Sequence, residues 1–273
     1  MDVANAGMYD GSTSLAEGAL MATRVTKRNR VAVLNTLSPL YIDVLKTYAQ
    51  SRNITIDVVS DETLELSDDT ACLLVQNPNF FGYLSDMDRL STMTHSSGAL
   101  LVVAVDPISL GMFTPPGSYD ADIVTAEAQG MGVPVTFGGP YSGIFTCKQR
   151  YVRQMPGRIV GKTVDSKNRT AYVLTLQTRE QHIRRETATS NICTSVALIA
   201  LMSTIYMAAN GKRGLRHIAE LCYHKSHYAA SLIEALPKYS LPIKGTFFKE
   251  FVIKCPISPS EINERLLDKG IIG

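Results

Sequence analysis

Short apolar runs that alternate with longer amphipathic stretches are the feature that most constrains the fold of this chain. Six runs rich in Val, Ile and Leu recur in the first half, at residues 31–35, 54–59, 71–76, 99–105, 122–126 and 143–147. They are too uniformly apolar for strands with one face in water, which favours a largely parallel sheet covered on both sides. The stretches 39–52 and 83–95 have helical length, and Ser38 before Pro39 is a good helix start. The sequence therefore predicts an α/β fold, with an opening helix and then repeated strand and helix units.

The character of the chain changes after Lys148. A basic, polar connector leads to an expected strand at 171–176 and a polar run. A long apolar helix at 192–209 and an amphipathic helix at 214–236 follow, and Pro237 ends the second. We expect a further strand at 247–255 and a helix at 259–269. The pattern predicts a large domain over residues 1–236 and the beginning of a small C-terminal α+β domain over 237–273.

Composition excludes several classes of protein. The 273 residues are 45% hydrophobic, which is enough for a sizeable core, and the net charge of +2 is too small to attract nucleic acid or an anionic membrane. Five cysteines lie far apart without a CxxC pair, as expected of reduced packing thiols in an intracellular protein. The acidic N-terminus does not resemble a secretory signal. Four hydroxyl side chains and flanking bases favour a buried helix over a membrane span at 192–209.

Three stretches resemble functional motifs but depart from them. The stretch 157–163 is one residue short of a phosphate-binding loop, and no parallel strand precedes it. Gly130 and Gly132 begin a dinucleotide fingerprint, but Pro134 stands where a helix would open. The histidines at 217, 224 and 227 share one helix face, but no carboxylate or thiolate is placed to complete a metal site. We therefore expect no metal.

Several long segments resemble the glycine cleavage system P-protein, the glycine decarboxylase. They include MDVANAGMYDGSTSLAEGALMA at the N-terminus, FGGPYSGIF, RQMPGRIVGKTVD, LTLQTREQHIRRETATSNICT and the closing ERLLDKGIIG. The resemblance covers essentially the whole chain and is to subunit 1, which corresponds to the N-terminal half of single-chain forms. Family chains extend beyond both ends of this sequence, so we expect a truncated fragment.

The resemblance implies a pyridoxal-phosphate enzyme of the aminotransferase type, fold type I, with a large mixed, mostly parallel sheet. In that fold a helix N-terminus holds the cofactor phosphate, a strand-end Asp pairs with the pyridinium nitrogen, and a Lys bonds the cofactor. The matching positions here are Asn5 in the turn before the first helix, Asp106 after the run 99–105, and the neighbourhood of Gly130.

The lysine is missing at its expected place. No Lys occurs between Arg89 and Lys148, and Gly130 cannot supply an amine. This agrees with subunit 1, and it implies a degenerate pocket at Asn5, Asp106 and Gly130. Asp106 could equally be a strand-end carboxylate that caps the following turn.

The working cofactor site would then be shared with a partner. Thr189, Ser190 and Asn191 precede the long apolar helix, and in related enzymes a threonine in a comparable connector reaches the phosphate of the neighbouring subunit. The alternative is an ordinary helix cap. The polar side chains just upstream could line the same interface or form a solvated surface, and the sequence assigns them no individual roles: Gln177, Arg179, His182, Arg184 and Arg185.

The predicted function is that of the non-Lys-bearing subunit of glycine decarboxylase, an enzyme only as part of a complex. With a Lys-bearing subunit 2 that holds pyridoxal phosphate, it would decarboxylate glycine and pass the aminomethyl group to the lipoyl group of H-protein. We expect a cytoplasmic location, or the mitochondrial matrix for a eukaryotic single-chain form. The alternatives are a non-catalytic aminotransferase-like scaffold and a self-sufficient pyridoxal-phosphate enzyme that uses another lysine, such as Lys148 or Lys162.

Overall fold

The computed structural model describes residues 1–192 and 196–272. Its main element is a seven-stranded sheet in the order β1-β7-β6-β5-β4-β2-β3. The five strands from β2 to β6 run parallel, and β7 pairs antiparallel with both β6 and β1. The strands are β1 (Val3–Ala4), β2 (Arg30–Leu34), β3 (Thr55–Val59), β4 (Thr70–Asn77), β5 (Leu100–Val105), β6 (Ile123–Glu127) and β7 (Gly143–Cys147). The predicted α/β class and mostly parallel sheet are confirmed.

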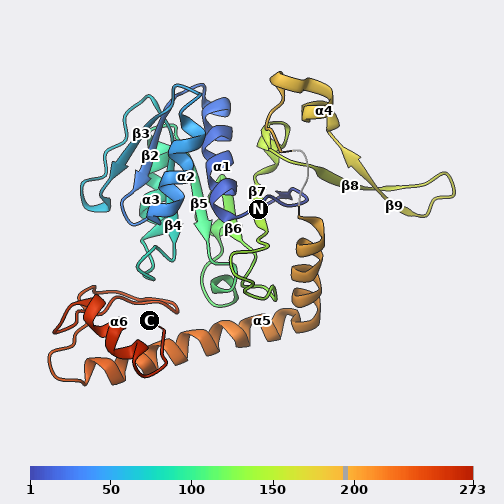
Figure 1. Ribbon diagram of the computed structural model, residues 1–273. Helices are drawn as coiled ribbons and strands as arrows, with labels where there is room; N and C mark the ends of the chain where they lie inside the picture. The colour runs from blue at the N-terminus through green and yellow to red at the C-terminus, as the bar shows by residue number, and fades with distance from the viewer. Residues whose placement is uncertain (193–195, 273) are drawn as a thin grey trace.

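Helices cover both faces of the sheet, as Figure 1 shows. Side chains of α1 (Gly11–Thr26) and α2 (Pro39–Ala49) pack with alternate residues of the strands in one core. α3 (Met87–Ser96) packs on the opposite face with the residues in between, such as Leu73 and Leu101. Because strand side chains alternate between faces, two buried faces require the uniformly apolar strands that the sequence shows.

A second, two-stranded sheet follows β7. It consists of β8 (Ile159–Val164) and β9 (Thr170–Thr175), and the short helix α4 (Gln181–Arg184) comes after it. The sequence predicted β9 but assigned residues 148–169 to a connector, because Gly161 and Lys162 interrupt the apolar run of β8. The 157–163 stretch therefore leads into a hairpin strand, whereas a phosphate-binding loop leads into a helix.

The remaining helices are α5 (Ala197–Glu234) and α6 (Pro259–Leu267). α5 bends sharply at Gly211, whose φ of 58° and ψ of −176° are not helical, so the predicted break between 209 and 214 is confirmed. Its start is corrected: the helix begins at Ala197, whereas the prediction began at 192, and residues 193–195, which include Cys193, lie outside the described residues. Ile199 and Ser203 are buried, but Leu198 on the other side is exposed, so the first half of α5 is buried on one face only.

Two other predictions are wrong in detail. The helix expected at 83–95 begins at Met87, because the Asp86 carboxylate caps it by accepting a hydrogen bond from the Arg89 backbone N–H. The strand expected at 247–255 is irregular chain, which makes only isolated bridges from Phe247 to Tyr83 and from Lys254 to Ser240. The domain boundary at 236 and 237 stays a prediction.

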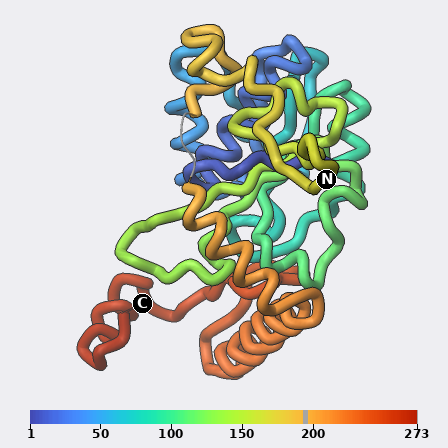
Figure 2. Tube along the Cα trace, turned by 90° about the vertical axis from the view of Figure 1, so that its right-hand side faces the viewer, coloured from blue at the N-terminus to red at the C-terminus, as the bar shows by residue number. Residues whose placement is uncertain are grey.

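The C-terminal segment lies across the carboxyl edge of the parallel strands. Figure 2, turned by 90°, shows the second half of α5 and the following chain beneath the sheet domain, as Figure 1 does. The Phe248 N–H donates to the Gly82 carbonyl at 3.0 Å, and the Leu84 N–H donates to the Thr246 carbonyl at 2.9 Å. This places residues 246–250 over the ends of β4 and β5, where a pocket forms. Short 3-10 helices complete the described elements: Asp61–Thr63, Ser109–Gly111, Pro116–Tyr119, Gln149–Gln154, Gln177–Arg179 and Arg185–Thr187.

Candidate functional site

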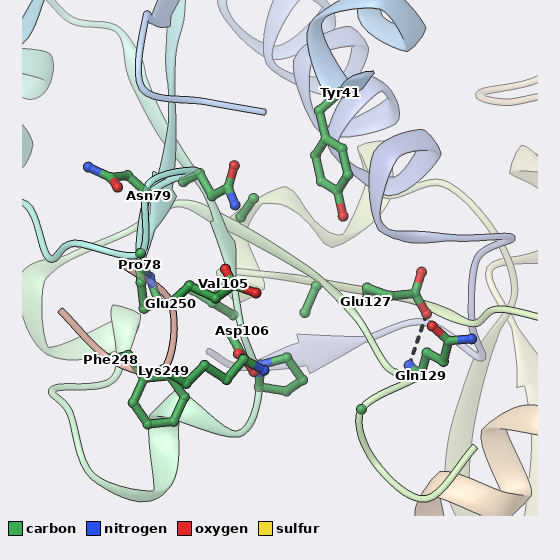
Figure 3. A pocket seen from close by; sticks show the side chains of 16 residues that line it. Tyr41, Pro78, Asn79, Val105, Asp106, Glu127, Gln129, Phe248, Lys249 and Glu250 are labelled. Carbon is green, nitrogen blue, oxygen red and sulfur yellow. Dashed lines mark hydrogen bonds and ion pairs between the residues drawn. The ribbon is translucent and has the colours of Figure 1, made fainter. Parts of the chain in front are cut away.

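A pocket of about 380 Å³ opens at the carboxyl ends of β4, β5 and β6. This edge of a parallel sheet is where ligands bind in α/β folds. The pocket is closed on one side by residues 248–250 of the C-terminal segment, and Figure 3 shows the side chains that line it. Asp106 and Gly130 both lie there, so the structure brings together two of the three predicted positions.

The Asp106 carboxylate is committed to partners within the chain. One of its oxygens lies 2.5 Å from the Nζ of Lys249, and the other accepts a hydrogen bond from the Ile108 backbone N–H at 2.9 Å. Burial lowers the pKa of Lys249, but the charge of Asp106 and their hydrogen bond outweigh it, so the pKa is raised overall. Lys249 is therefore an ammonium ion at neutral pH. Asp106 both caps its turn and forms an ion pair.

The N-terminus of α1 carries a carboxylate of the same chain. Oε2 of Glu127, the last residue of β6, accepts a hydrogen bond from the Gly11 N–H at 2.9 Å. The other oxygen accepts from the backbone N–H groups of Gln129 at 3.0 Å and Ser142 at 3.1 Å. A helix N-terminus favours an anion, and here Glu127 is that anion. Asp10 adds a second carboxylate by capping the helix through the Thr13 N–H.

Tyr41 completes this side of the pocket. Its hydroxyl points toward Glu127 in Figure 3. Burial raises the pKa of Tyr41 to about 12, and the charges of Glu127 and Asp10 act in the same direction. The phenol is therefore neutral at physiological pH. It adds bulk beside the helix N-terminus, where a Cβ on Gly11 would come within 2.5 Å of its oxygen.

Gly130 and Asn5 differ in their placement. Gly130 lines the pocket and has open space around it, since an added Cβ would meet only Ile108 at 3.9 Å. Asn5 lies in a neighbouring cavity of about 850 Å³ between α5 and the sheet. Its amide donates to the Pro156 carbonyl at 3.1 Å and its oxygen accepts from the Gly7 N–H at 3.0 Å. Asn5 thus lies ahead of the first helix, as expected, but in a cavity beside the pocket of Asp106 and Gly130, and α1 itself begins at Gly11.

The segment of Thr189, Ser190 and Asn191 does not cap α5, which begins at Ala197. Ser190 is buried, and its oxygen accepts from the Ile192 N–H at 3.1 Å. Burial raises the pKa of Glu17 on α1, while Arg24 and a hydrogen bond from Ser190 oppose the rise. Thr189 is half-buried and Asn191 exposed. Of the three, Ser190 thus serves to anchor the segment to α1.

The polar residues before this segment hold the connector together. Arg179 donates to the carbonyls of Met155, Gly157 and Leu176. The other contacts are local, from Gln177 to the Leu174 carbonyl, from Arg184 to the Thr178 carbonyl and from His182 to Glu180 at 3.7 Å, and Arg185 is exposed.

Lys249 and Glu127 line the pocket as well, although no sequence motif points to either as a site residue. In the sequence, Glu127 directly follows the apolar run 122–126, as Asp106 follows the run 99–105, so its position was an available signal. Lys249 had none, because it comes from a distant irregular segment. Within residues 1–192 and 196–272 no group of His, Cys, Asp and Glu could hold a metal ion. His227 instead stacks on Phe247 with ring centroids 3.8 Å apart.

Comparison with known proteins assigns the family. The family model described as glycine cleavage system P-protein matches residues 1–272. The chain belongs to this P-protein family. A crystal structure of glycine decarboxylase (P-protein) of the glycine cleavage system, in inhibitor-bound form, is similar with a TM-score of 0.97 and 40% identity over 100% of this chain and 64% of that one.

Two curated relatives carry the description probable glycine dehydrogenase (decarboxylating) subunit 1. The one from Desulforamulus reducens is 50% identical and the one from Thermomicrobium roseum 49%, each over 100% of this chain. The chain spans 63% of the length of these relatives. A Burkholderia pseudomallei sphingosine-1-phosphate lyase is similar in fold alone, with a TM-score of 0.65 and 14% identity over 97% of this chain and 61% of that one. The P-protein chain thus has the fold of the fold type I pyridoxal-phosphate enzymes. Among the described residues, the helices are too short or too polar to cross a membrane.

Proposed function

We propose that this chain forms the non-Lys-bearing subunit of a glycine decarboxylase, which decarboxylates glycine only together with a second subunit. The proposal is carried by the residues that line the pocket at the sheet edge. Relatives of this chain are described as subunit 1 of glycine dehydrogenase, and the pocket lacks the free amine that an enzyme holding pyridoxal phosphate by itself would need.

The charges that line this pocket do not match those of pyridoxal phosphate. At the N-terminus of α1 the cofactor phosphate would lie beside the Glu127 carboxylate, and the two negative charges would repel each other. Asp106 is neutralised by Lys249 and has no free charge for a pyridinium ring. Gly130 offers no amine. Positions that would receive the cofactor's charges are filled by charges of the chain itself, so we assign the pocket at Asp106 and Gly130, with Asn5 beside it, as degenerate.

The cofactor would then be held by the Lys-bearing subunit 2, and this chain would contribute from across the interface. We propose that Thr189 and Asn191 face the partner's cofactor phosphate, with Ser190 holding the segment in place. Support comes from the exposed Asn191, the half-buried Thr189 and the anchoring of Ser190. The backbone amides at the N-terminus of α5 do not support it, because that helix starts further on, at Ala197.

The complete enzyme would pass the aminomethyl group from glycine to the lipoyl group of H-protein. The cofactor supplies the electron sink for loss of carbon dioxide. The role of this chain is to shape the cleft and the interface. We place the enzyme in the bacterial cytoplasm, because the relatives come from bacteria, and they give no support to the mitochondrial alternative.

Reconstitution tests this function. The subunit that carries this sequence is mixed with the Lys-bearing subunit and H-protein, and the exchange of bicarbonate into the carboxyl group of glycine is measured. We expect exchange from the mixture and none from either subunit alone. Exchange by the Lys-bearing subunit alone, at the rate of the mixture, would support the non-catalytic scaffold instead.

The self-sufficient alternative loses its two named lysines. Lys148 pairs with Asp122 at 2.9 Å, at the amino edge of β6 and away from the pocket. Lys162 lies in β8 of the hairpin. The lysine that lines the pocket is Lys249, and its raised pKa keeps the amine protonated and non-nucleophilic.

A further inference from the structure

The β8 and β9 hairpin stands away from the rest of the chain. Figure 1 shows it projecting sideways from the sheet domain, and Figure 2 views the molecule from that side. The ladder runs from the pair of Ile159 with Thr175 to the pair of Val164 with Thr170. Ile159 at the base is buried in the main core, whereas the strands become exposed further out. The hairpin is thus anchored at one end only.

One face of the hairpin is apolar and exposed. Val160 pairs with Leu174 on this face. Tyr172, which is 69% exposed, pairs with Lys162 and is a diagonal neighbour of Val164, which is 56% exposed. Val173 on the other face is half exposed as well. A two-stranded ribbon without a packed face is marginally stable in water, so a long hairpin with an apolar face is typical of an arm that packs against something else.

The tip of the hairpin is preformed. The Asp165 carboxylate accepts hydrogen bonds from the backbone N–H groups of Lys167 at 2.8 Å and Arg169 at 2.9 Å, and it also pairs with the Arg169 guanidinium at 2.8 Å. Asn168 takes the left-handed conformation that closes the turn, with φ at 57°. In the described part of the chain no carboxylate pairs with Lys162 or Lys167, so two cations remain available at the end of the hairpin.

Charge is segregated along the sequence. Residues 148–185 contain ten Lys and Arg but two Asp and Glu, in a chain whose net charge is +2. The rest of the chain is therefore net negative. Part of the positive charge is used internally, by Lys148 and Arg150 on Asp122 and by Arg169 on Asp165. Among the described residues, Lys162 and Lys167 of the hairpin have no such carboxylate partner. The surface that meets the hairpin must be acidic for the two to be complementary.

We propose that this hairpin is a docking arm for the second, Lys-bearing subunit, which presents an apolar strip with an acidic border to Val164, Tyr172 and the two lysines. The inference rests on the proposed function, because that function supplies the partner. The arm also leads, through the connector held by Arg179, into the segment of Thr189 and Asn191. Docking of the arm would therefore set the position of that segment at the interface.

The experiment measures the affinity of the subunit that carries this sequence for the Lys-bearing subunit of the same source. The double variant Val164→Ser with Tyr172→Ser removes the apolar face of the arm. The matched control is Leu40→Ser with Val58→Ser, whose side chains are 74% and 53% exposed on α2 and β3. We expect the arm variant to bind about ten- to a hundredfold more weakly and the control to bind within about twofold. Both should melt at the wild-type temperature when isolated, because the changed side chains are exposed.

A second variant tests the charges. Lys162→Gln with Lys167→Gln should slow association and reduce its dependence on salt concentration, while leaving the fold unchanged. Unchanged affinity in both variants would overturn the proposal. So would a loss confined to self-association, which would assign the arm to a second copy of this chain.

The outcomes for arm and function are distinguishable. If the variants bind normally and the mixture still exchanges bicarbonate, the arm proposal fails and the proposed function stands. If the wild-type subunits neither bind nor exchange, both fail.

Discussion

At the scale of single residues, Asp122 shows how a buried charge is retained. Its side chain is fully buried at the start of β6 and lies 2.8 to 2.9 Å from His95, Lys148 and Arg150. It also accepts a hydrogen bond from the Leu101 N–H at 3.0 Å. Burial by itself raises the pKa of Asp122. The four hydrogen-bond partners together lower the pKa by more than burial raises it, so the pKa lies below its usual range.

Asp122→Asn breaks a buried ion pair and should destabilise the chain by about 3 kcal/mol at pH 7. This is the low end of the usual range, because the side chains of its partners are partly exposed to solvent. A carboxyl with a depressed folded-state pKa stabilises the fold above its unfolded pKa of about 3.9, and that contribution is lost as the pH falls through the folded pKa. The difference between wild type and variant should therefore shrink below about pH 4. Urea unfolding at several pH values measures it, and a difference independent of pH would contradict the assignment.

Substitutions of Thr189 and Ser190 should affect different properties of the complex. In the reconstituted complex, Thr189→Val should weaken retention of pyridoxal phosphate about three- to tenfold, the value of one neutral hydrogen bond, with assembly unchanged. Ser190→Ala should instead cost about 1–3 kcal/mol of stability, because it removes a partner of the buried Glu17. Cofactor titration and thermal unfolding of both variants give the comparison. Equal effects on stability and none on retention would leave the segment a purely structural connector.

The position of Asp106 in the pocket can be predicted from the sequence, but the position of Lys249 cannot. A carboxylate directly after a buried strand must lie at the sheet edge, so its place follows from local pattern. Its partner comes from irregular chain far along the sequence, and only tertiary folding brings the two within 2.5 Å.

At the scale of elements, α5 shows what hydropathy can and cannot locate. The run of apolar residues predicted the helix and its interruption, but not its start, because apolar character continues upstream of Ala197. The sequence did not predict β8, because it shows too little apolar character there. A strand that is exposed on both faces has no alternation of apolar and polar residues to detect.

The bend in α5 depends on Gly211. Its φ and ψ lie in a region essentially open to glycine only, and an added Cβ would meet no atom within 4 Å. Gly211→Ala should therefore destabilise the chain by about 1–3 kcal/mol through backbone strain alone. Gly130→Ala is the control, because Gly130 has open space and an ordinary φ, and it should change stability by less than about 0.5 kcal/mol. Chemical denaturation compares them, and equal small effects would show that α5 can straighten.

At the scale of the whole molecule, the fold of the pyridoxal-phosphate enzymes is kept. In the function proposed above, the positions that would receive the cofactor's charges carry charges of the chain itself. The resemblance in sequence predicted the fold and the missing lysine. It did not predict that Glu127 would close the N-terminus of α1 or that Lys249 would neutralise Asp106. Those contacts join β6 to α1 and the C-terminal segment to β5, so they depend on the arrangement of the complete sheet edge.

Borohydride reduction of the assembled complex in the presence of pyridoxal phosphate, followed by peptide mapping, tests the central claim most directly. The account predicts a stoichiometric pyridoxyl adduct on a lysine of the partner subunit and none on this chain, because Gly130 has no amine and Lys249 is held as an ammonium ion by Asp106. A stoichiometric adduct on Lys249, or on any other lysine of this chain, would contradict it.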